Sequence, residues 1–137
     1  KVGVGNRKVY YYRRNNYDSA TTKFNIRNLI NGDLAIEEIR KNLRINSTII
    51  DRMLDLHKCL FSMGAVVRIK ANCKEKEYSQ EYKRFKTYLH EHAPKFIFSH
   101  DVSLYRRGLL LGAYFCPILM AWLDLLRRKR IASVSVE

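Results

Sequence analysis

Apolar side chains that recur every three or four residues are the feature that most constrains how this 137-residue chain can fold. Residues 49–63 and residues 78–89 both show this spacing, which places the apolar side chains on one face of an α-helix. Each stretch therefore predicts an amphipathic helix with one face in a core. The stripe of Tyr78, Tyr82 and Phe85 also resembles a stacking platform for single-stranded nucleic acid, but its helical spacing favours a core position.

Capping and helix-breaking residues give the expected helix boundaries. Asp33 is a good N-cap for a helix over 34–44. Thr48 and Asp51 resemble a capping box for a second helix, which Gly64 would end as the C′ residue. The two have helix-turn-helix proportions. Further helices are expected over 74–92, ending at Pro94, over 102–115, and over 118–130, with Pro117 in the first turn of the last one.

Residues with a preference for strands predict a β component. Lys8–Arg14 is rich in Val and Tyr and leads into Asn15-Asn16, which favours a strand followed by a tight turn. Tyr17–Phe24 is then either the second strand of a hairpin or the approach to a helix, and Asn31-Gly32 closes the unit. Ala65–Ala71 alternates apolar and basic residues and predicts a half-buried strand, and Lys95–Phe98 predicts a shorter one. The sequence thus predicts one α+β domain over residues 8–130, in which a small N-terminal β-hairpin or sheet packs with about five helices. Residues 1–7 are expected to form a flexible basic arm and residues 131–137 a frayed tail.

The charge of the chain predicts its partner. There are 26 Lys and Arg against 13 Asp and Glu, a net charge of +13. The surplus lies at the two ends, since residues 31–64 carry five groups of each sign. Such a surplus favours a polyanion, and we expect DNA. The predicted phosphate contacts come from the hairpin region and from the segment after Gly64, and they are Lys8, Arg13, Arg14, Lys23, Arg27, Arg68, Lys70, Lys74, Lys83, Arg84 and Lys86.

Two other partners stay open. Double-stranded RNA would be recognised by shape through its phosphates and 2′-hydroxyls. A protein-interaction or assembly domain would use the Tyr-rich strand Val9–Tyr12 as a pairing edge, and homo-oligomerisation also stays open. The helix-turn-helix-like pair carries no net charge, which favours a scaffold role over base reading.

A run of fifteen uncharged residues, Leu109–Leu123, raises the question of a membrane. It is shorter than the ~20 residues that a bilayer-spanning helix needs, and it contains Gly112 and Pro117. The flanking Arg106-Arg107 and residues 127–130 suit an interfacial helix at anionic lipid. We interpret the run as buried core helices, so a membrane is not the favoured partner.

Catalytic and metal-binding motifs are absent from the sequence. It has no phosphate-cradling Gly-x4-Gly-Lys loop, no Gly-x-Ser-x-Gly elbow and no Cys-x2-Cys pair. We therefore predict a non-catalytic protein with no cofactor, metal or small-molecule substrate. The odd number of cysteines (three) does not suit a secreted disulfide framework and favours an intracellular setting, in the nucleus or cytoplasm.

Two segments resemble the KilA-N family of DNA-binding domains of large DNA viruses, phages and bacteria, which is related in fold to fungal APSES domains. Tyr17–Phe24 (Tyr-Asp-Ser-Ala-Thr-Thr-Lys-Phe) is similar to the motif near the front of that family, with one residue added. Leu111–Trp122 is similar to its helix, break and helix near the back, with Cys116 in place of the family's Ser. The resemblance covers roughly residues 9–126 and implies DNA binding without catalysis, in an infected host cell if the protein is viral.

Overall fold

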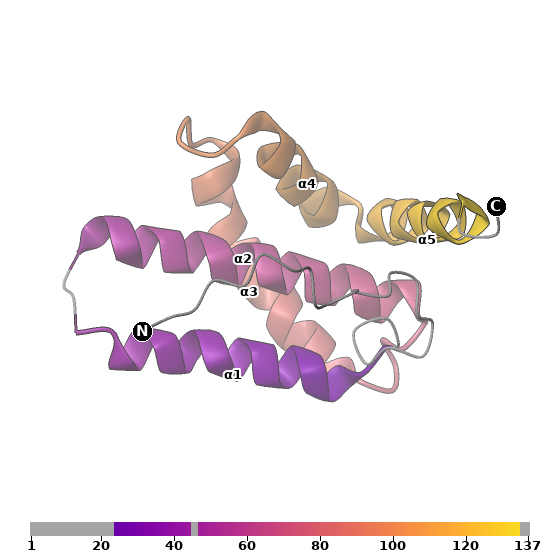
Figure 1. The fold of residues 1–137 in the computed structure, drawn as a ribbon, viewed down its shortest axis with the longest axis horizontal. Coiled ribbons are helices and arrows are strands. Elements are labelled where there is room, and N and C mark those ends of the chain that lie inside the picture. Colours follow the sequence, from indigo (N-terminus) through magenta and orange to yellow (C-terminus); the bar gives the residue numbers. More distant parts are fainter. Residues whose placement is uncertain (1–23, 45–46, 135–137) are drawn as a thin grey trace, which may run out of the picture.

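The computed structural model describes residues 24–44 and 47–134, and this part of the chain is helical (Figure 1). It contains five helices and no strand, and 82% of it is helix. The predicted α+β class is therefore wrong for the described residues, whose fold is mainly helical. The helices are α1 (Ile26–Asn42), α2 (Thr48–Ala71), α3 (Ser79–Ile97), α4 (Leu104–Phe115) and α5 (Pro117–Val134).

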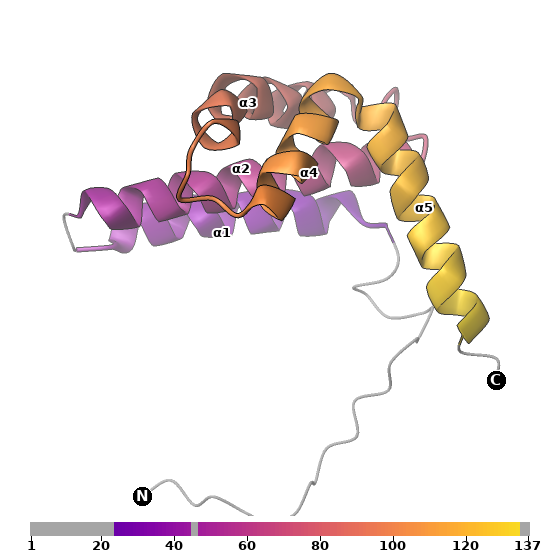
Figure 2. The same ribbon diagram turned by 90° about the horizontal axis from the view of Figure 1, so that it is seen from above.

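The helices stack around α2, the longest of them. α1 and α2 run antiparallel and side by side, and α3 crosses behind α2 (Figure 1). α4 and α5 lie on the side of α2 that faces away from α1, where they form an L whose corner is Cys116 (Figures 1 and 2). α1 and α2 therefore form an antiparallel hairpin of helices. The predicted helix-turn-helix-like pair is wrong, because that motif needs two helices that cross steeply.

α1 begins eight residues before the predicted start of the first helix. Asn25 is its N-cap, and the Asn25 side chain accepts a hydrogen bond of 2.9 Å from the Arg27 backbone N–H. Asn31-Gly32 therefore lies inside the helix and closes no hairpin. Gly32 allows the close approach of α2, since a Cβ atom there would lie 2.5 Å from Cζ of Phe61. The predicted hairpin itself, Lys8–Phe24, lies outside the described residues except for Phe24.

α2 runs straight through Gly64 and through the predicted strand Ala65–Ala71. Its buried residues continue the helical spacing of the preceding turns, and they are Cys59, Ser62, Ala65, Val66, Val67 and Ile69. The local alternation of basic and apolar residues was misleading because a helix also exposes Arg68 while it buries both neighbours. The capping box is not formed either, as the N-cap is Ser47, without a side-chain hydrogen bond.

α3 continues past Pro94, and the predicted strand Lys95–Phe98 is its last turn and C-cap. Phe96 and Ile97 are buried there, so packing offsets the lost N–H of the proline. The two helices predicted over 102–115 and 118–130 are observed as α4 and α5, and α5 begins at Pro117.

Two groups of buried residues form the core. One joins α2, α3 and α4 and contains Cys59, Leu89, Ala93 and Leu110 among others. The other joins α1, α2 and α3 around Phe85, which is 1% exposed, with Phe61 and Tyr82 packed against it. Tyr82 and Phe85 of the aromatic stripe therefore belong to the core, as their spacing predicts, whereas Tyr78 is the N-cap of α3 and lies against Phe24.

Candidate docking surface

The predicted phosphate-contacting residues are only partly within the described chain. Lys8, Arg13, Arg14 and Lys23 lie outside it. Arg27 in the first turn of α1, Arg68 on α2, and Lys83 and Lys86 on α3 are exposed. These four side chains form no ion pair in the part of the chain that the structure describes, so they remain able to bind an external anion.

The other three predicted contacts are held by carboxylates of the same chain. Lys70 pairs with Glu75 at 2.5 Å, Lys74 pairs with Glu77, and Arg84 lies 3.0 Å from Asp33. The hydrogen bond from Lys70 lowers the pKa of Glu75 and raises the pKa of Lys70. These three cations are thus neutralised internally and are poor candidates for phosphate contacts.

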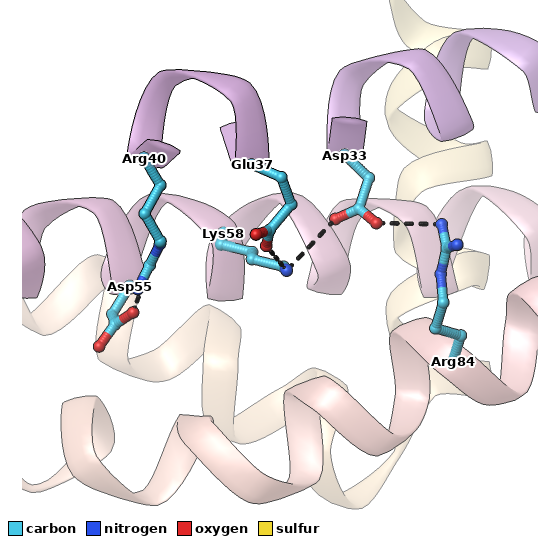
Figure 3. Close-up of polar contacts among 6 residues, drawn as sticks. All are labelled: Asp33, Glu37, Arg40, Asp55, Lys58 and Arg84. Atoms are coloured by element: carbon cyan, nitrogen blue, oxygen red, sulfur yellow. Dashed lines mark hydrogen bonds and ion pairs between the residues drawn. The ribbon is translucent and has the colours of Figure 1, made fainter. Parts of the chain in front are cut away.

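Several of the remaining charged side chains form a polar network between α1, α2 and α3 (Figure 3). Asp33, which is 8% exposed, lies between Arg84 and Lys58, whose Nζ is 3.9 Å from Asp33 Oδ1. Lys58 donates a hydrogen bond to Glu37 and thereby lowers the pKa of that carboxyl. A second link joins Arg40 to Asp55. The network fixes α1 on its two neighbours, and we interpret it as structural.

Lys58 also lies over the Tyr88 ring, 4.6 Å from its centroid. Burial raises the pKa of Tyr88 to about 12, so its hydroxyl stays protonated at neutral pH. Sequence reasoning missed this network, since its members come from three separate helices.

The largest departure from expectation is an apolar stripe on the outside of α4. Leu104, Leu111 and Phe115 are 79%, 43% and 75% exposed. Their spacing of seven and four residues places them on one face of the helix. Leu110 and Ala113, on the opposite face, are fully buried in the core. α4 therefore presents apolar side chains to both the core and the solvent.

α5 carries a second stripe of exposed apolar residues after the corner at Cys116. Its exposed apolar residues include Ile118, Leu119, Trp122 and Leu125, which again share one face. Ala121 is buried, and Asp124, on the other side of α5 from Leu119 and Trp122, forms an ion pair of 2.7 Å with Arg128. α5 therefore exposes large apolar side chains to solvent, while Asp124 and Arg128 are partly exposed. We give the name apolar track to seven of the exposed apolar residues of the two helices: Leu104, Leu111, Phe115, Ile118, Leu119, Trp122 and Leu125.

The prediction that Leu109–Leu123 forms buried core helices is therefore wrong, because many apolar side chains of this run are exposed. Helical spacing alone does not say which face of an amphipathic helix turns toward the core. In the described chain, no helix combines the length and the hydropathy needed to cross a bilayer.

The two helices of the track carry a surplus of cations. Residues 104–134 contain six Arg and Lys and one acidic residue, Asp124, which is a net charge of +5. Arg107 donates a hydrogen bond of 2.6 Å to the Ile97 carbonyl, whereas Arg106 and Arg127 are exposed and have no carboxylate partner in the described part. Uncompensated cations thus lie on both helices that carry the track.

Metal-binding side chains do not gather in the described residues. No set of three or more His, Cys, Asp or Glu side chains there is placed to hold a metal ion. Burial raises the pKa of the Cys59 thiol to about 12 and keeps it protonated, and Cys73 and Cys116 are exposed free thiols.

Comparison with protein-family models, curated proteins and solved structures gives no match. The resemblance to KilA-N domains therefore stays a prediction. Its second segment, Leu111–Trp122, coincides with the end of α4, the break at Cys116 and the start of α5.

Proposed function

We propose that this chain is a non-catalytic docking module that attaches to an apolar partner surface through the apolar track. The observation that carries the proposal is the exposure of apolar residues at helical spacing on two consecutive helices. Large contiguous apolar patches are rare on monomeric proteins and mark sites of association. Covering them is favourable by about 25 cal/mol for each Å² of apolar surface removed from water.

The track is long enough to carry specific binding. Leu104 and Phe115 are eleven residues apart, which is about 16 Å along a helix at 1.5 Å per residue. Residues 118–125 add about 10 Å along α5 by the same rise. α4 and α5 lie on the side of α2 that faces away from α1 (Figure 1), and the track residues on both helices are exposed.

Trp122 provides a direct test, because it lies in the track and is the single tryptophan of the chain. Micelles of dodecylphosphocholine, which have no net charge and an apolar interior, serve as the probe. We expect them to move Trp122 emission to shorter wavelength and to protect it from acrylamide quenching. The double variant Phe115→Glu, Leu119→Glu should lose both effects.

The matched control places two glutamates on α1, as Leu34→Glu, Ile39→Glu. Both residues are about half exposed and lie outside the track. The control should respond to micelles as the natural chain does, and circular dichroism should show equal helix content in all three proteins. The docking proposal would be contradicted if micelles did not change Trp122 emission, or if they changed it equally in both double variants.

DNA binding is the second candidate function, and the exposed cations Arg27, Arg68, Lys83 and Lys86 favour it. Phosphate contacts supply most non-specific affinity for DNA and make it salt-dependent. Mobility shifts with duplex DNA, duplex RNA and single strands at two salt concentrations test this candidate. Lys83→Gln, Lys86→Gln should weaken DNA binding and reduce its salt dependence, and a variant that binds as the natural chain does would count against it.

A further inference from the structure

We infer that the partner of the apolar track is the surface of a lipid bilayer that contains anionic phospholipids. This inference rests on the proposed docking function and names the partner of the same surface.

The shape of the surface favours a bilayer. α4 and α5 meet at a corner (Figure 2), with Cys116 between them, and the track residues on both helices are exposed. A protein partner would need a groove that fits both arms of the L at once. Lipid acyl chains and headgroups, in contrast, rearrange around a helix that lies in the interface. Neither α4 nor α5 qualifies to span the bilayer, so the helices would lie along its surface.

The residue types in the track also match an interfacial position. Leu, Ile and Phe side chains would enter the acyl boundary, as they do on the apolar faces of interfacial helices. Trp122 lies among them, and Tyr105 on α4 is 73% exposed beside them. Tryptophan and tyrosine are enriched at the level of the lipid headgroups because each has an apolar ring and a polar tip.

The charge selects anionic lipid. Residues 104–134 have a net charge of +5, and their one carboxylate is paired with Arg128. Arg106 and Arg127 are exposed on the two arms of the L without a described partner. Long cationic side chains reach from an apolar contact to lipid phosphates while their stems cover apolar surface. The same charge argues against a second copy of the chain as the occupant, because two such surfaces repel each other.

The test uses the full chain and two kinds of vesicle, one of phosphatidylcholine alone and one of three parts phosphatidylcholine to one part phosphatidylglycerol. Co-sedimentation and Trp122 emission should both report binding to the anionic vesicles and much weaker binding to the neutral ones. Arg106→Gln, Arg127→Gln should weaken binding to anionic vesicles by about fivefold for each arginine removed.

The control variant Lys83→Gln, Lys86→Gln removes the same charge from α3, and its binding should change by less than about twofold because exposed charges far from the surface are screened. Phe115→Glu, Leu119→Glu should abolish binding to the anionic vesicles.

Three results would overturn the inference. Equal binding to neutral and anionic vesicles would remove the role of charge and leave the docking proposal intact. Anionic binding that survives Phe115→Glu, Leu119→Glu would remove the role of the track. Failure to bind either vesicle, with Trp122 still responding to micelles, would assign the track to a protein. Loss of the micelle response itself would instead overturn the docking proposal.

Discussion

Asp33 shows how one side chain can be assigned the wrong role from sequence. As a polar residue after Asn31-Gly32, it is a good N-cap. In the fold it lies in the second turn of α1, is nearly buried, and pairs with Arg84 across to α3. Its Oδ1 atom accepts no hydrogen bond and depends on the charge of Lys58 at 3.9 Å. The partners of Asp33 are distant in sequence, so no local pattern predicts them.

The variant Asp33→Asn should lower the free energy of unfolding by about 1–3 kcal/mol, because it leaves buried polar groups without their charged partner. Lys58 keeps Glu37 as a partner, which limits the loss. Urea unfolding followed by circular dichroism measures the difference.

The control is Glu38→Gln in the same helix, where the carboxylate pairs with the exposed Lys41. Surface pairs of this kind contribute little, so the control should stay within about 0.5 kcal/mol of the natural chain. Equal losses in the two variants would show that the Asp33 network does not stabilise the fold.

Individual helices were predictable where periodicity was long and uninterrupted. The amphipathic stretch 49–63 lies within α2 and residues 79–89 lie within α3, whose N-cap is Tyr78. The predicted helix 118–130 lies within α5, and the predicted helix 102–115 begins two residues before α4. Their ends were less predictable, because Gly64 and Pro94 are signals for helix termination that packing overrides here. Gly64 lies between buried turns of α2, and Pro94 is followed by the buried Phe96.

The variant Gly64→Ala distinguishes a helix interior from a helix end. A Cβ atom at Gly64 would have no neighbour within 4 Å, and the residue does not have a positive φ. Alanine should therefore raise the free energy of unfolding by about 0.5–1 kcal/mol, the difference in helix propensity. Thermal and urea unfolding both measure this effect.

The companion variant Gly32→Ala provides the contrast within α1. Its new methyl group would lie 2.5 Å from the Phe61 ring, so the gain in propensity should be offset or reversed. A loss of stability in Gly64→Ala would indicate that α2 ends at Gly64 after all.

Across the chain, the sequence was informative about the amount of apolar surface and uninformative about where it faces. α5 has an apolar face and a charged face, which predicts an amphipathic helix but not its orientation. Ala121 is buried and Asp124 pairs with Arg128, while Ile118, Leu119 and Trp122 are exposed. Only the assembled helices show that the larger apolar side chains are left uncovered.

The combination of a large positive charge and an exposed apolar track predicts how the free chain associates in solution. At low ionic strength a net charge of +13 should keep the molecules apart. At 1 M salt the screening length falls to about 3 Å, so the apolar tracks should no longer be kept apart by repulsion. Sedimentation velocity should therefore show a monomer at low salt and larger species at high salt.

Phe115→Glu, Leu119→Glu should stay monomeric at both salt concentrations. Leu34→Glu, Ile39→Glu, with the same change in charge, should associate as the natural chain does. Vesicle binding should have the opposite salt dependence, since screening weakens the attraction of Arg106 and Arg127 to anionic lipid. An association that salt does not promote, or that both double variants share, would show that the track is not the surface through which the molecules meet.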